Sequence, residues 1–423
     1  MDSMFGLVDG NNFYASCERV FNPSLRGQPV VILSNNDGCA IARSNEAKAL
    51  GVRMGEPIHL IEPKVRRQLK VLSANFGLYG DLSARVVSLL RDLFAQVEVY
   101  SIDESFVTFD GIREADRERF AREARARILK WTGIPCCVGI GPTKTLAKLA
   151  NKRAKKTTHG VLTALPGSPE LESFPIEDLW GVGRKWAARL GNDGILTAAD
   201  LARADGDTLR SRYGVVLART QRELQGVVCA ELEEAEPDRK QIVVSRSFGK
   251  EVESLEDLQQ AVSTFAQRAC EKLRARSLQA GGMWIFFHTN PFKPDVPQYH
   301  PSKAFHFIRS TQDTREVLMV ANGLAKALWK PGYRWKKAGV GLLDLSNTDV
   351  QQGDLFSGVD QRATPLMGVL DEINGKFGRR TMQFAASGWR PKGNALQAPA
   401  WRMNQSALSP AYTTRWDELM RVR

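Results

Sequence analysis

The stretch VEVYSIDESFVTF, residues 97–109, decides the fold of its surroundings, because two adjacent acids interrupt a β-sequence there. β-Branched and aromatic residues dominate on both sides, which is typical of strands. In one continuous strand the side chains of Asp103 and Glu104 would point to opposite faces, and one charge would be buried. The pattern therefore predicts a hairpin with residues 101–105 at its tip, from which both carboxylates project the same way. A solvated turn is the alternative interpretation of an isolated acidic pair.

A third acid weakens that alternative. Asp9 ends a short apolar strand at residues 4–8 and is followed by Gly10. If this strand lies beside the hairpin, three carboxylates converge, and they repel one another unless cations neutralise them. Oxygen-only ligands select hard ions, above all Mg²⁺, and two such ions about 4 Å apart serve phosphoryl transfer in polymerases and nucleases. We therefore expect Asp9, Asp103 and Glu104 to form a metal-dependent phosphoryl-transfer site.

Composition limits the class of protein. The chain has 423 residues, which favours several domains, and its hydrophobic content of 43% is enough for well-packed cores. The formal net charge of +12 favours a polyanionic partner, most often nucleic acid. The six cysteines form no C-x-x-C pair and the histidines have no zinc spacing, so no zinc site is expected. We see neither a signal peptide nor an 18-residue apolar run, and we expect a cytoplasmic protein without a membrane span.

The first 165 residues have a mixed α/β pattern. A strand at 29–33 is followed by a turn and then by residues 41–58, which are predicted to form a helix ended by Gly51. Residues 81–96 and 112–132 have the spacing of amphipathic helices. One sheet covered by helices is expected from strands at residues 5–8, 97–100, 106–109 and 136–140.

The rest of the chain divides into three parts. Residues 170–230 look helical and self-contained, and an acid-rich linker follows at 230–240. Residues 242–345 return to an α/β pattern, with strands on both sides of a helix at 255–276. Beyond residue 346 the content of Gln, Gly, Ser and Pro rises, which predicts a tail of short elements. The fold class is therefore α+β and multidomain.

Three motifs carry a resemblance to a known family. DGNNFYASCE (9–18), YSIDESF (100–106) and VGIGPTKTLAKLANKRAKK (138–156) resemble the Y-family, or translesion, DNA polymerases in order and spacing. The resemblance narrows to the branch of that family that acts in the SOS response to DNA damage. It does so through three further stretches, VVILSNNDGCAIARSNEAKALGVRMGEP (30–57), LWGVGRKWAARLGNDGILTAADLA (179–202) and ALSPAYTTRWDELMRVR (407–423).

The resemblance implies a right-hand polymerase and its reaction. The reaction would be the error-prone addition of a deoxynucleotide to a primer 3′ end opposite a damaged template base, by two-metal phosphoryl transfer. The implied divisions are a palm (1–17 and 77–165), fingers (18–76), a helical thumb with a helix-hairpin-helix (166–230), a linker (231–241), an α/β little finger (242–345) and a C-terminal tail (346–423).

The resemblance also assigns the acids their roles. Asp9 and Asp103 would bridge two Mg²⁺ ions, and Glu104 would hold the ion that activates the primer 3′ oxygen. The Gly10 carbonyl would be a further ligand. Many family members have a second acid two residues after the first, but this chain has Asn11 there, so we do not count it as a ligand.

Two aromatic residues follow the first acid. Tyr14 lies five residues after Asp9, which is the steric-gate position of the family, where a ring under the sugar clashes with a 2′-hydroxyl. An ordinary core aromatic residue is the alternative interpretation. Phe13 would pack against the sugar and base of the nucleotide.

Basic residues are expected to bind the triphosphate, whose negative charge requires fixed cations. The resemblance assigns this role to Lys48 of the fingers and Lys155 of the palm. Where the family often has Thr and Tyr, this chain has Ala42 and Asn45, so Arg43 would take over part of the contact. The stretch 138–156 that contains Lys155 has three further lysines at helical spacing, Lys144, Lys148 and Lys152. For these, the alternative to a binding role is that they form a solvated helix face.

Contacts to DNA and to partners complete the expectations. Gly181 and Gly183 of the helix-hairpin-helix pattern would let backbone N–H groups approach a DNA phosphate. Arg246 and Lys250, in SRSFGKEV (245–252), are further candidates for phosphate contacts. QGDLF (352–356) resembles the bacterial sliding-clamp-binding peptide. Its anchoring side chains would be those of Gln352, Leu355 and Phe356.

The implied partners are primer-template DNA, dNTPs, the sliding clamp, a dimer of cleaved UmuD and a RecA filament. The last two would dock on the tail beyond residue 357, and the protein would be associated with the nucleoid. Two rival functions remain: a two-metal nuclease or cyclase on a related palm, and a non-catalytic DNA-binding scaffold with an inactive palm.

Overall fold

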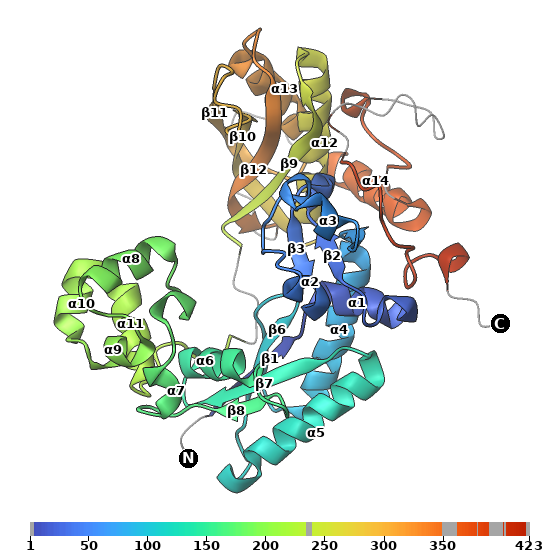
Figure 1. Ribbon diagram of the computed structural model, residues 1–423. Helices are drawn as coiled ribbons and strands as arrows, with labels where there is room; N and C mark the ends of the chain where they lie inside the picture. The colour runs from blue at the N-terminus through green and yellow to red at the C-terminus, as the bar shows by residue number, and fades with distance from the viewer. Residues whose placement is uncertain are drawn as a thin grey trace. The chain divides into compact units, whose positions relative to one another are not determined.

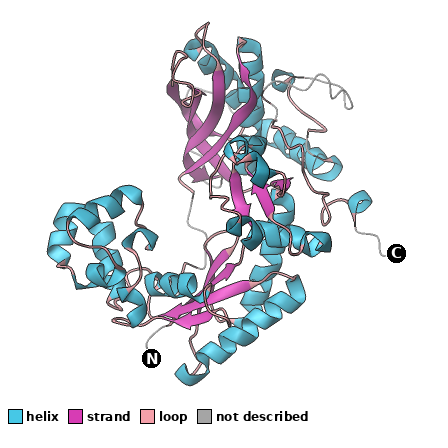
Figure 2. Cartoon of the chain, in the orientation of Figure 1, coloured by secondary structure: helices cyan, strands magenta, loops and turns pink. Residues whose placement is uncertain are grey.

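The computed structural model describes residues 4–233, 239–348, 362–378, 380–388, 401 and 403–419. The chain forms two compact units (Figure 1), which we call unit 1 (residues 1–237 with 406–423) and unit 2 (residues 238–405). Both units combine helices and strands, so the α+β class is confirmed (Figure 2). Among the described residues, no helix is long and apolar enough to cross a membrane.

A five-stranded sheet forms the centre of unit 1, in the order β5-β6-β1-β7-β8. Its middle strand, β1, pairs antiparallel with β6 on one side and with β7 on the other. The predicted single sheet is therefore confirmed, with β8 as an additional edge strand. The strands are β1 (Phe5–Gly10), β5 (Val97–Val99), β6 (Glu104–Thr108), β7 (Cys136–Gly141) and β8 (Val161–Thr163).

Alternation along β1 decides which helix each side chain meets. Val8 packs with residues of α4 (Phe76–Leu93) and α5 (Glu114–Thr132) on one face. Phe5 and Leu7 pack on the other face, which α6 (Lys144–Ala154) covers through Ala147. Asp9 has the same parity as Leu7, so its side chain lies on the α6 face.

The close approach of α6 to the sheet depends on Gly139 in β7. A Cβ atom at this position would lie 2.0 Å from the backbone nitrogen of Asn151 and 2.2 Å from the carbonyl oxygen of Ala147. Neither backbone atom can move aside, so glycine is required. The result is that polar side chains of α6 reach the ends of the strands.

A second sheet of unit 1 has the order β3-β2-β4, and α1 (Phe13–Phe21) packs against it. The helix expected over residues 41–58 is wrong, because Ala40–Arg43 forms the short strand β3 with its alanines buried, and only Asn45–Ala49 is helical, as α2. Ser44 explains the break, since its side chain caps α2 by accepting a hydrogen bond from Ala47 N. The other elements here are β2 (Val30–Leu33), α3 (Pro63–Arg66) and β4 (Lys70–Ser73).

The helical region of unit 1 confirms the prediction for residues 170–230. Its helices pack around one apolar cluster that also includes Leu146 and Leu149 of α6. Glu223 fixes the connection to α6, because its carboxylate accepts hydrogen bonds from the backbone N–H and the hydroxyl of Thr145. The helices are α7 (Pro169–Glu172), α8 (Arg184–Asn192), α9 (Ala198–Arg203), α10 (Gly206–Tyr213) and α11 (Val215–Leu224).

Unit 2 contains an antiparallel four-stranded sheet in the order β11-β10-β12-β9, with α12 (Leu255–Arg274) and α13 (Thr314–Leu328) packed against one face. The prediction missed β11 and α13. The opposite face carries a stacked pair of rings, Trp284 and Phe286, with centroids 5.0 Å apart. These rings lie against Gly341 and Gly339, where a Cβ would collide with them. The strands are β9 (Gln241–Val252), β10 (Leu278–Thr289), β11 (Ser302–Thr311) and β12 (Trp335–Asn347).

The described residues beyond 346 include a longer helix than predicted. Instead of only short elements, they contain the 15-residue helix α14 (Ala363–Phe377). Asp371 of α14 forms a two-pronged ion pair with Arg274 of α12, at 2.6 and 2.8 Å. The helix is therefore part of unit 2, because a buried guanidinium holds it there.

Candidate active site

Two acids face each other at the ends of neighbouring strands. Asp9 of β1 is the direct cross-strand partner of Glu104 of β6, and the Gly10 N–H donates a 2.9 Å hydrogen bond to the Asp103 carbonyl. The predicted hairpin is confirmed by the antiparallel pairing of β5 with β6, but β6 begins at Glu104, so the tip is shorter than expected. Like charges directly opposite each other on one sheet face are destabilising without a counter-charge.

The two acids of the hairpin do not project the same way, contrary to the prediction. Glu104 lies within the strand and shares the α6 face with Phe106. Asp103 precedes the strand and is exposed, and its Oδ1 accepts a 2.7 Å hydrogen bond from Ser101 Oγ. Because the extended backbone begins at Glu104, the side chains of Asp103 and Glu104 point to opposite sides.

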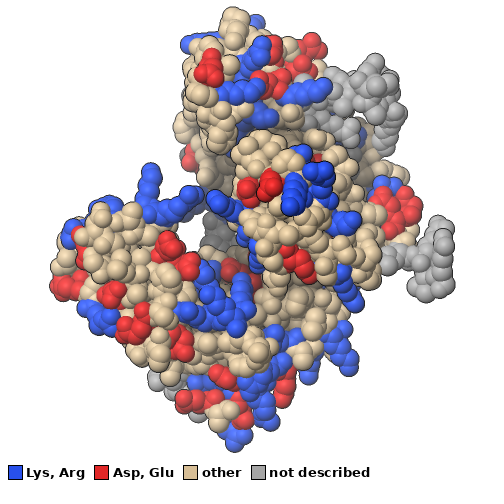
Figure 3. Space-filling view, in the orientation of Figure 1, with Lys and Arg blue, Asp and Glu red and all other residues tan. Residues whose placement is uncertain are grey.

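Lysines of α6 neutralise the acids on the α6 face. Lys155 Nζ, just beyond the end of α6, lies 2.6 Å from Asp9 Oδ2, and Lys148 Nζ lies 3.0 Å from Glu104 Oε2. Lys144 is 4% exposed and pairs with Glu98 at 2.5 Å. A solvated helix face is therefore wrong for Lys144 and Lys148. Figure 3 shows lysine and arginine side chains gathered around α6 on the face turned to the viewer.

The electrostatics of Asp9 reflect this crowding. Burial raises the pKa of Asp9 to about 6, against the opposing effect of Lys155, and the carboxylates of Glu104 and Asp103 raise it further. The three acids are thus close enough to interact, as the sequence predicted. Their charge and their oxygen-only donors suit a hard divalent cation. Among the described residues, however, no three acidic, histidine or cysteine side chains are already arranged as a ligand group. Binding a cation would require the carboxylates to leave their lysines.

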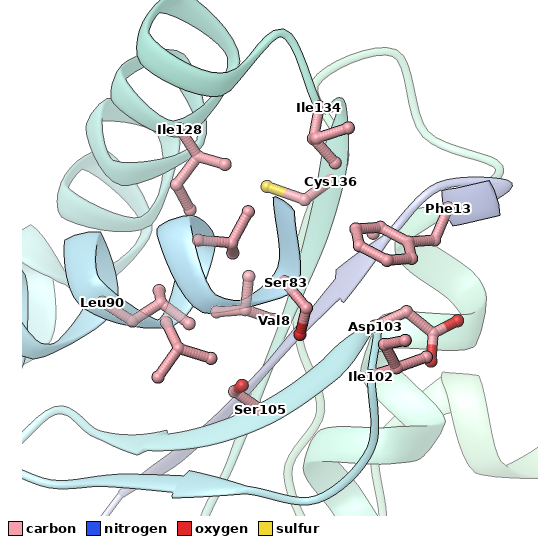
Figure 4. Close-up of a pocket in the computed structure, with 13 residues that line it drawn as sticks. Val8, Phe13, Ser83, Leu90, Ile102, Asp103, Ser105, Ile128, Ile134 and Cys136 are labelled. Atoms are coloured by element: carbon pink, nitrogen blue, oxygen red, sulfur yellow. The ribbon is translucent and has the colours of Figure 1, made fainter. Parts of the chain in front are cut away.

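An apolar cavity lies beside the acids, between the sheet and the helices α4 and α5 (Figure 4). Val8, Leu90 and Ile128 are among its lining residues, and Asp103 and Phe13 stand at one end. Its mainly apolar lining is unsuited to a triphosphate, so we do not assign it as a substrate site.

The predicted steric gate has an accessible ring on an aromatic support. Tyr14 of α1 is half-buried and stacks on Tyr79 of α4, with centroids 4.5 Å apart and planes 15° from parallel. Phe76 meets Tyr14 edge-on at 5.9 Å. Burial, followed by the Asp103 carboxylate, raises the pKa of Tyr14, so the phenol lies near the acids. Phe13, in contrast, is only 4% exposed and packs in the core.

The three cations predicted to bind the triphosphate lie together. Burial lowers the pKa of Lys48, and the charges of Arg43 and Lys155 lower it further, while Asp9 opposes them. Lys48 Nζ donates a 2.6 Å hydrogen bond to Asn12 Oδ1. Arg43 donates from Nη1 to the Val52 carbonyl at 2.7 Å, and its buried Nε has no hydrogen-bond partner among the described residues. The structure therefore brings these cations beside the first acid.

The candidate DNA contacts differ in their exposure. Gly183 is the N-cap of α8, and Gly181 has a φ of +83°, a conformation that favours glycine. Lys250 is exposed, but Arg246 is half-buried and pairs across strands with core residue Ala338. Burial lowers the pKa of Arg246, and the nearby charge of Arg380 adds to this effect. The clamp-binding motif at residues 352–356 lies outside the described residues.

Sequence reasoning missed a second polar centre behind the gate. Glu18 of α1 is 1% exposed, and its Oε1 accepts hydrogen bonds from Tyr79 Oη at 2.7 Å and from Ser409 Oγ at 3.0 Å. The sequence signal that could have identified Glu18 is a charged residue on the buried face of a predicted helix. The contribution of Ser409 had no signal in the sequence.

Comparisons with known proteins agree with this arrangement. The impB/mucB/samB family profile matches residues 8–152, and the profile of the family's C-terminal domain matches residues 239–355. Protein UmuC of Salmonella typhimurium strain LT2 is 44% identical over 99% of this chain and 100% of its own length. The chain belongs to the impB/mucB/samB family. The resemblance to the UmuC-like members of the Y family that the motifs indicated is therefore confirmed.

More distant matches extend beyond the impB/mucB/samB family. DNA polymerase IV of Bacillus velezensis is 26% identical over 90% of this chain and 92% of its own. A solved Y-family DNA polymerase chimera of Dbh and Dpo4 is 21% identical and shares the fold. Its TM-score is 0.66, over 81% of this chain and 99% of the chimera. A domain of unknown function matches residues 364–422.

Proposed function

We propose that the chain is an error-prone polymerase of the SOS response that performs translesion synthesis, adding dNTPs to a primer 3′ end with two Mg²⁺ ions. The observation that carries the proposal is the pairing of Asp9 with Glu104 at strand ends, with Asp103 beside them and three cations at the same place. Clustered carboxylates next to clustered cations suit a metal-bound triphosphate, because the carboxylates bind the positive metal ions and the cations bind the negative phosphates.

The polymerase class itself follows from the family. Relatives that match nearly the whole chain bear the names UmuC and MucB, and more distant ones the name DNA polymerase IV. The chain is accordingly a DNA-directed DNA polymerase.

The structural regions have natural counterparts in a right-hand polymerase. We assign the five-stranded sheet with α4, α5 and α6 to the palm and the β3-β2-β4 sheet to the fingers. We assign α7–α11 to the thumb and the unit 2 sheet to the little finger. The residue boundaries implied by the family resemblance are kept as part of this proposal.

In the proposed mechanism, Asp9, Asp103, Glu104 and the Gly10 carbonyl would hold the Mg²⁺ ions. Bound Mg²⁺ would stabilise charge on the attacking and leaving oxygens. Lys155 pairs with Asp9 in this structure, but its side chain is 43% exposed and can turn to a phosphate oxygen once Asp9 has another counter-charge. Lys48 and Arg43 would bind the same triphosphate.

Selection of the sugar would fall to Tyr14, with the ring of Phe13 tilted beside it. The Tyr14 ring is supported from behind by Tyr79, so it cannot retreat without disturbing the stack. A 2′-hydroxyl pressed against such a ring would clash. The role of Phe13 is packing of the gate rather than broad contact with the sugar, because its ring is buried.

DNA and partner contacts complete the proposal. Gly181, Gly183 and Lys250 are accessible for phosphate contacts, whereas Arg246 would have to leave its half-buried position. A solved structure with a similar fold, the insertion ternary complex of Dbh DNA polymerase, supports DNA and dNTP as partners. The sliding clamp, the cleaved UmuD dimer and the RecA filament remain predicted partners, with the clamp anchored by Gln352, Leu355 and Phe356.

Primer extension tests the function. Labelled primer-template, dNTPs and Mg²⁺ are incubated with the full chain, alone and with the predicted protein partners. Lengthened primer identifies a polymerase and shortened primer a nuclease. DNA binding with neither product, under every condition, would leave the inactive scaffold as the function.

A further inference from the structure

The C-terminal segment of residues 406–412 is part of unit 1 and lies along the start of α4. Ser73 N donates to the Ala407 carbonyl at 2.9 Å, and Ala407 N donates to Ser73 Oγ at 3.1 Å. Tyr412 stacks on Phe21 of α1, with centroids 5.0 Å apart and planes 7° from parallel. The segment therefore touches both the strand before α4 and the end of α1. It belongs to the part of the chain that matches a domain of unknown function.

Ser409 is the central residue of this contact. Its Oγ accepts a 2.9 Å hydrogen bond from Asn75 Nδ2 and donates a 3.0 Å hydrogen bond to Glu18 Oε1. Asn75 Nδ2 also approaches the carbonyls of Ser409 and Pro410. Asn75 is at the same time the N-cap of α4, because its Oδ1 accepts from Leu78 N. The single hydroxyl of Ser409 thus uses both its donor and its acceptor capacity in a site that is 9% exposed.

From Ser409 the contacts lead directly to the nucleotide gate. Glu18 Oε1 accepts from Tyr79 Oη at 2.7 Å, and the Tyr79 ring, which is fully buried, stacks on Tyr14. The hydrogen bond anchors the hydroxyl end of Tyr79, and the buried Tyr79 ring in turn supports the ring of Tyr14. Buried polar groups of this kind are costly to leave unpaired, so the arrangement is specified closely.

We infer that Ser409 and Glu18 are positioning residues for sugar selection, because they hold Tyr79 and thereby the Tyr14 ring in place. The inference rests on the proposed role of Tyr14 as the steric gate. It gives the segment 406–412 a function in nucleotide choice, although this segment supplies no group that touches the nucleotide. Burial raises the pKa of Glu18, while the hydroxyls of Tyr79 and Ser409 oppose that rise, so both hydrogen bonds favour the ionised carboxylate.

The experiment measures kcat/KM for a dNTP and for the matching rNTP in primer extension by the full chain. Tyr79→Phe removes the Tyr79 hydroxyl that donates to Glu18, and Ser409→Ala removes the Ser409 hydroxyl that donates to the same carboxylate. We expect the preference for dNTP to fall about threefold to tenfold in each, the size of one hydrogen bond. The change should lie in a lower KM for rNTP, with kcat for dNTP retained. Ser409→Thr restores a hydroxyl and should restore the preference.

Controls separate positioning from general loosening. Ser406→Ala is the matched variant, because Ser406 lies in the same segment but bonds to Asp37 instead of Glu18. It should leave the preference unchanged. The double variant Ser409→Ala with Tyr79→Phe should lose no more than the larger single loss, since the two bonds act through the same carboxylate. A purely structural role would lower kcat for both nucleotides and leave their ratio unchanged, which would overturn the inference.

A further arm distinguishes this inference from the proposed function. Tyr14→Ala should abolish most of the sugar preference. If it does not, the gate assignment itself is wrong. If it does while Tyr79→Phe and Ser409→Ala keep the full preference, the gate stands and only the role of the tail is overturned. Should Ser409→Ala fail to fold, Glu18→Gln and Tyr79→Phe test the same contacts from α1 and α4.

Discussion

Two buried carboxylates of the β1–α1 segment, Asp9 and Glu18, are held in opposite ways. Asp9 meets the ammonium group of Lys155 and two neighbouring carboxylates. Glu18 meets the hydroxyls of Tyr79 and Ser409. In the proposed mechanism the partly exposed lysine would exchange partners when metal and substrate bind, whereas the buried hydroxyls would keep their hydrogen bonds to the Glu18 carboxylate. The comparison separates a carboxylate suited to chemistry from one suited to positioning.

The acid site should be the most sensitive to substitution. Asp103→Asn should reduce primer extension roughly a hundredfold or more, because a metal ligand contributes several kcal/mol of transition-state stabilisation. DNA affinity, measured by fluorescence anisotropy, should be unchanged or higher, since the basic surface is intact. Asp110→Asn is the matched control, as Asp110 is an exposed acid just after the same hairpin. Normal extension by Asp103→Asn in Mg²⁺ would remove Asp103 from the site.

The next largest effect is expected at the exchangeable cation. Lys155→Ala should raise the KM for dNTP about tenfold, the effect of one charge-assisted hydrogen bond, while DNA affinity changes little. Lys152→Ala is the control, because Lys152 lies on α6 but pairs with Asp178. Steady-state kinetics at several dNTP concentrations make the measurement. If DNA affinity falls instead of nucleotide affinity, Lys155 belongs to the duplex surface.

The two carboxylates also show what the sequence could and could not reveal. Asp9 and Glu104 were predictable, because each stands at the edge of an apolar strand where an acid is out of place. The pairing of Asn75 with Ser409 was not predictable, since the two residues are 334 positions apart and neither is unusual in its own surroundings. Local patterns identify the strands, but only packing identifies which distant hydroxyl reaches a buried acid.

Errors in the element predictions have the same physical origin. Residues 41–43 were predicted to be helical because alanine and the following Glu and Lys favour helices, yet cross-strand pairing with β2 makes them part of a strand. The lysines of α6 looked like a solvated face because their helical spacing is common on surfaces. Gly139 brings that face against the strand ends, where the lysines meet acids.

A smaller effect should appear in the pH dependence of stability. Because burial raises the folded-state pKa of Glu18, its carboxyl favours folding at pH values below its ordinary pKa, and this contribution is lost as pH rises through the folded-state value. Wild type should therefore lose thermal stability relative to Glu18→Gln between pH 4 and pH 8. Melting temperatures of both proteins across this range provide the test. A pH-independent difference would show that the fold does not raise the pKa of Glu18.

The smallest effect concerns the thiol next to Glu18. Cys17 is fully buried, and burial, with the adjacent Glu18 carboxylate, raises the pKa of its thiol. Native protein at pH 8 should therefore leave Cys17 unlabelled by a thiol reagent while the half-buried Cys39 and Cys229 react. Peptide mass spectrometry identifies the labelled residues, and denatured protein is the control for full reactivity. Ser409→Ala should speed the labelling of Cys17 more than Ser406→Ala does, because only the first opens the cluster around Glu18. Rapid labelling of Cys17 in the wild type would mean that water already enters this cluster, and that Glu18 is not as firmly held as the contrast with Asp9 requires.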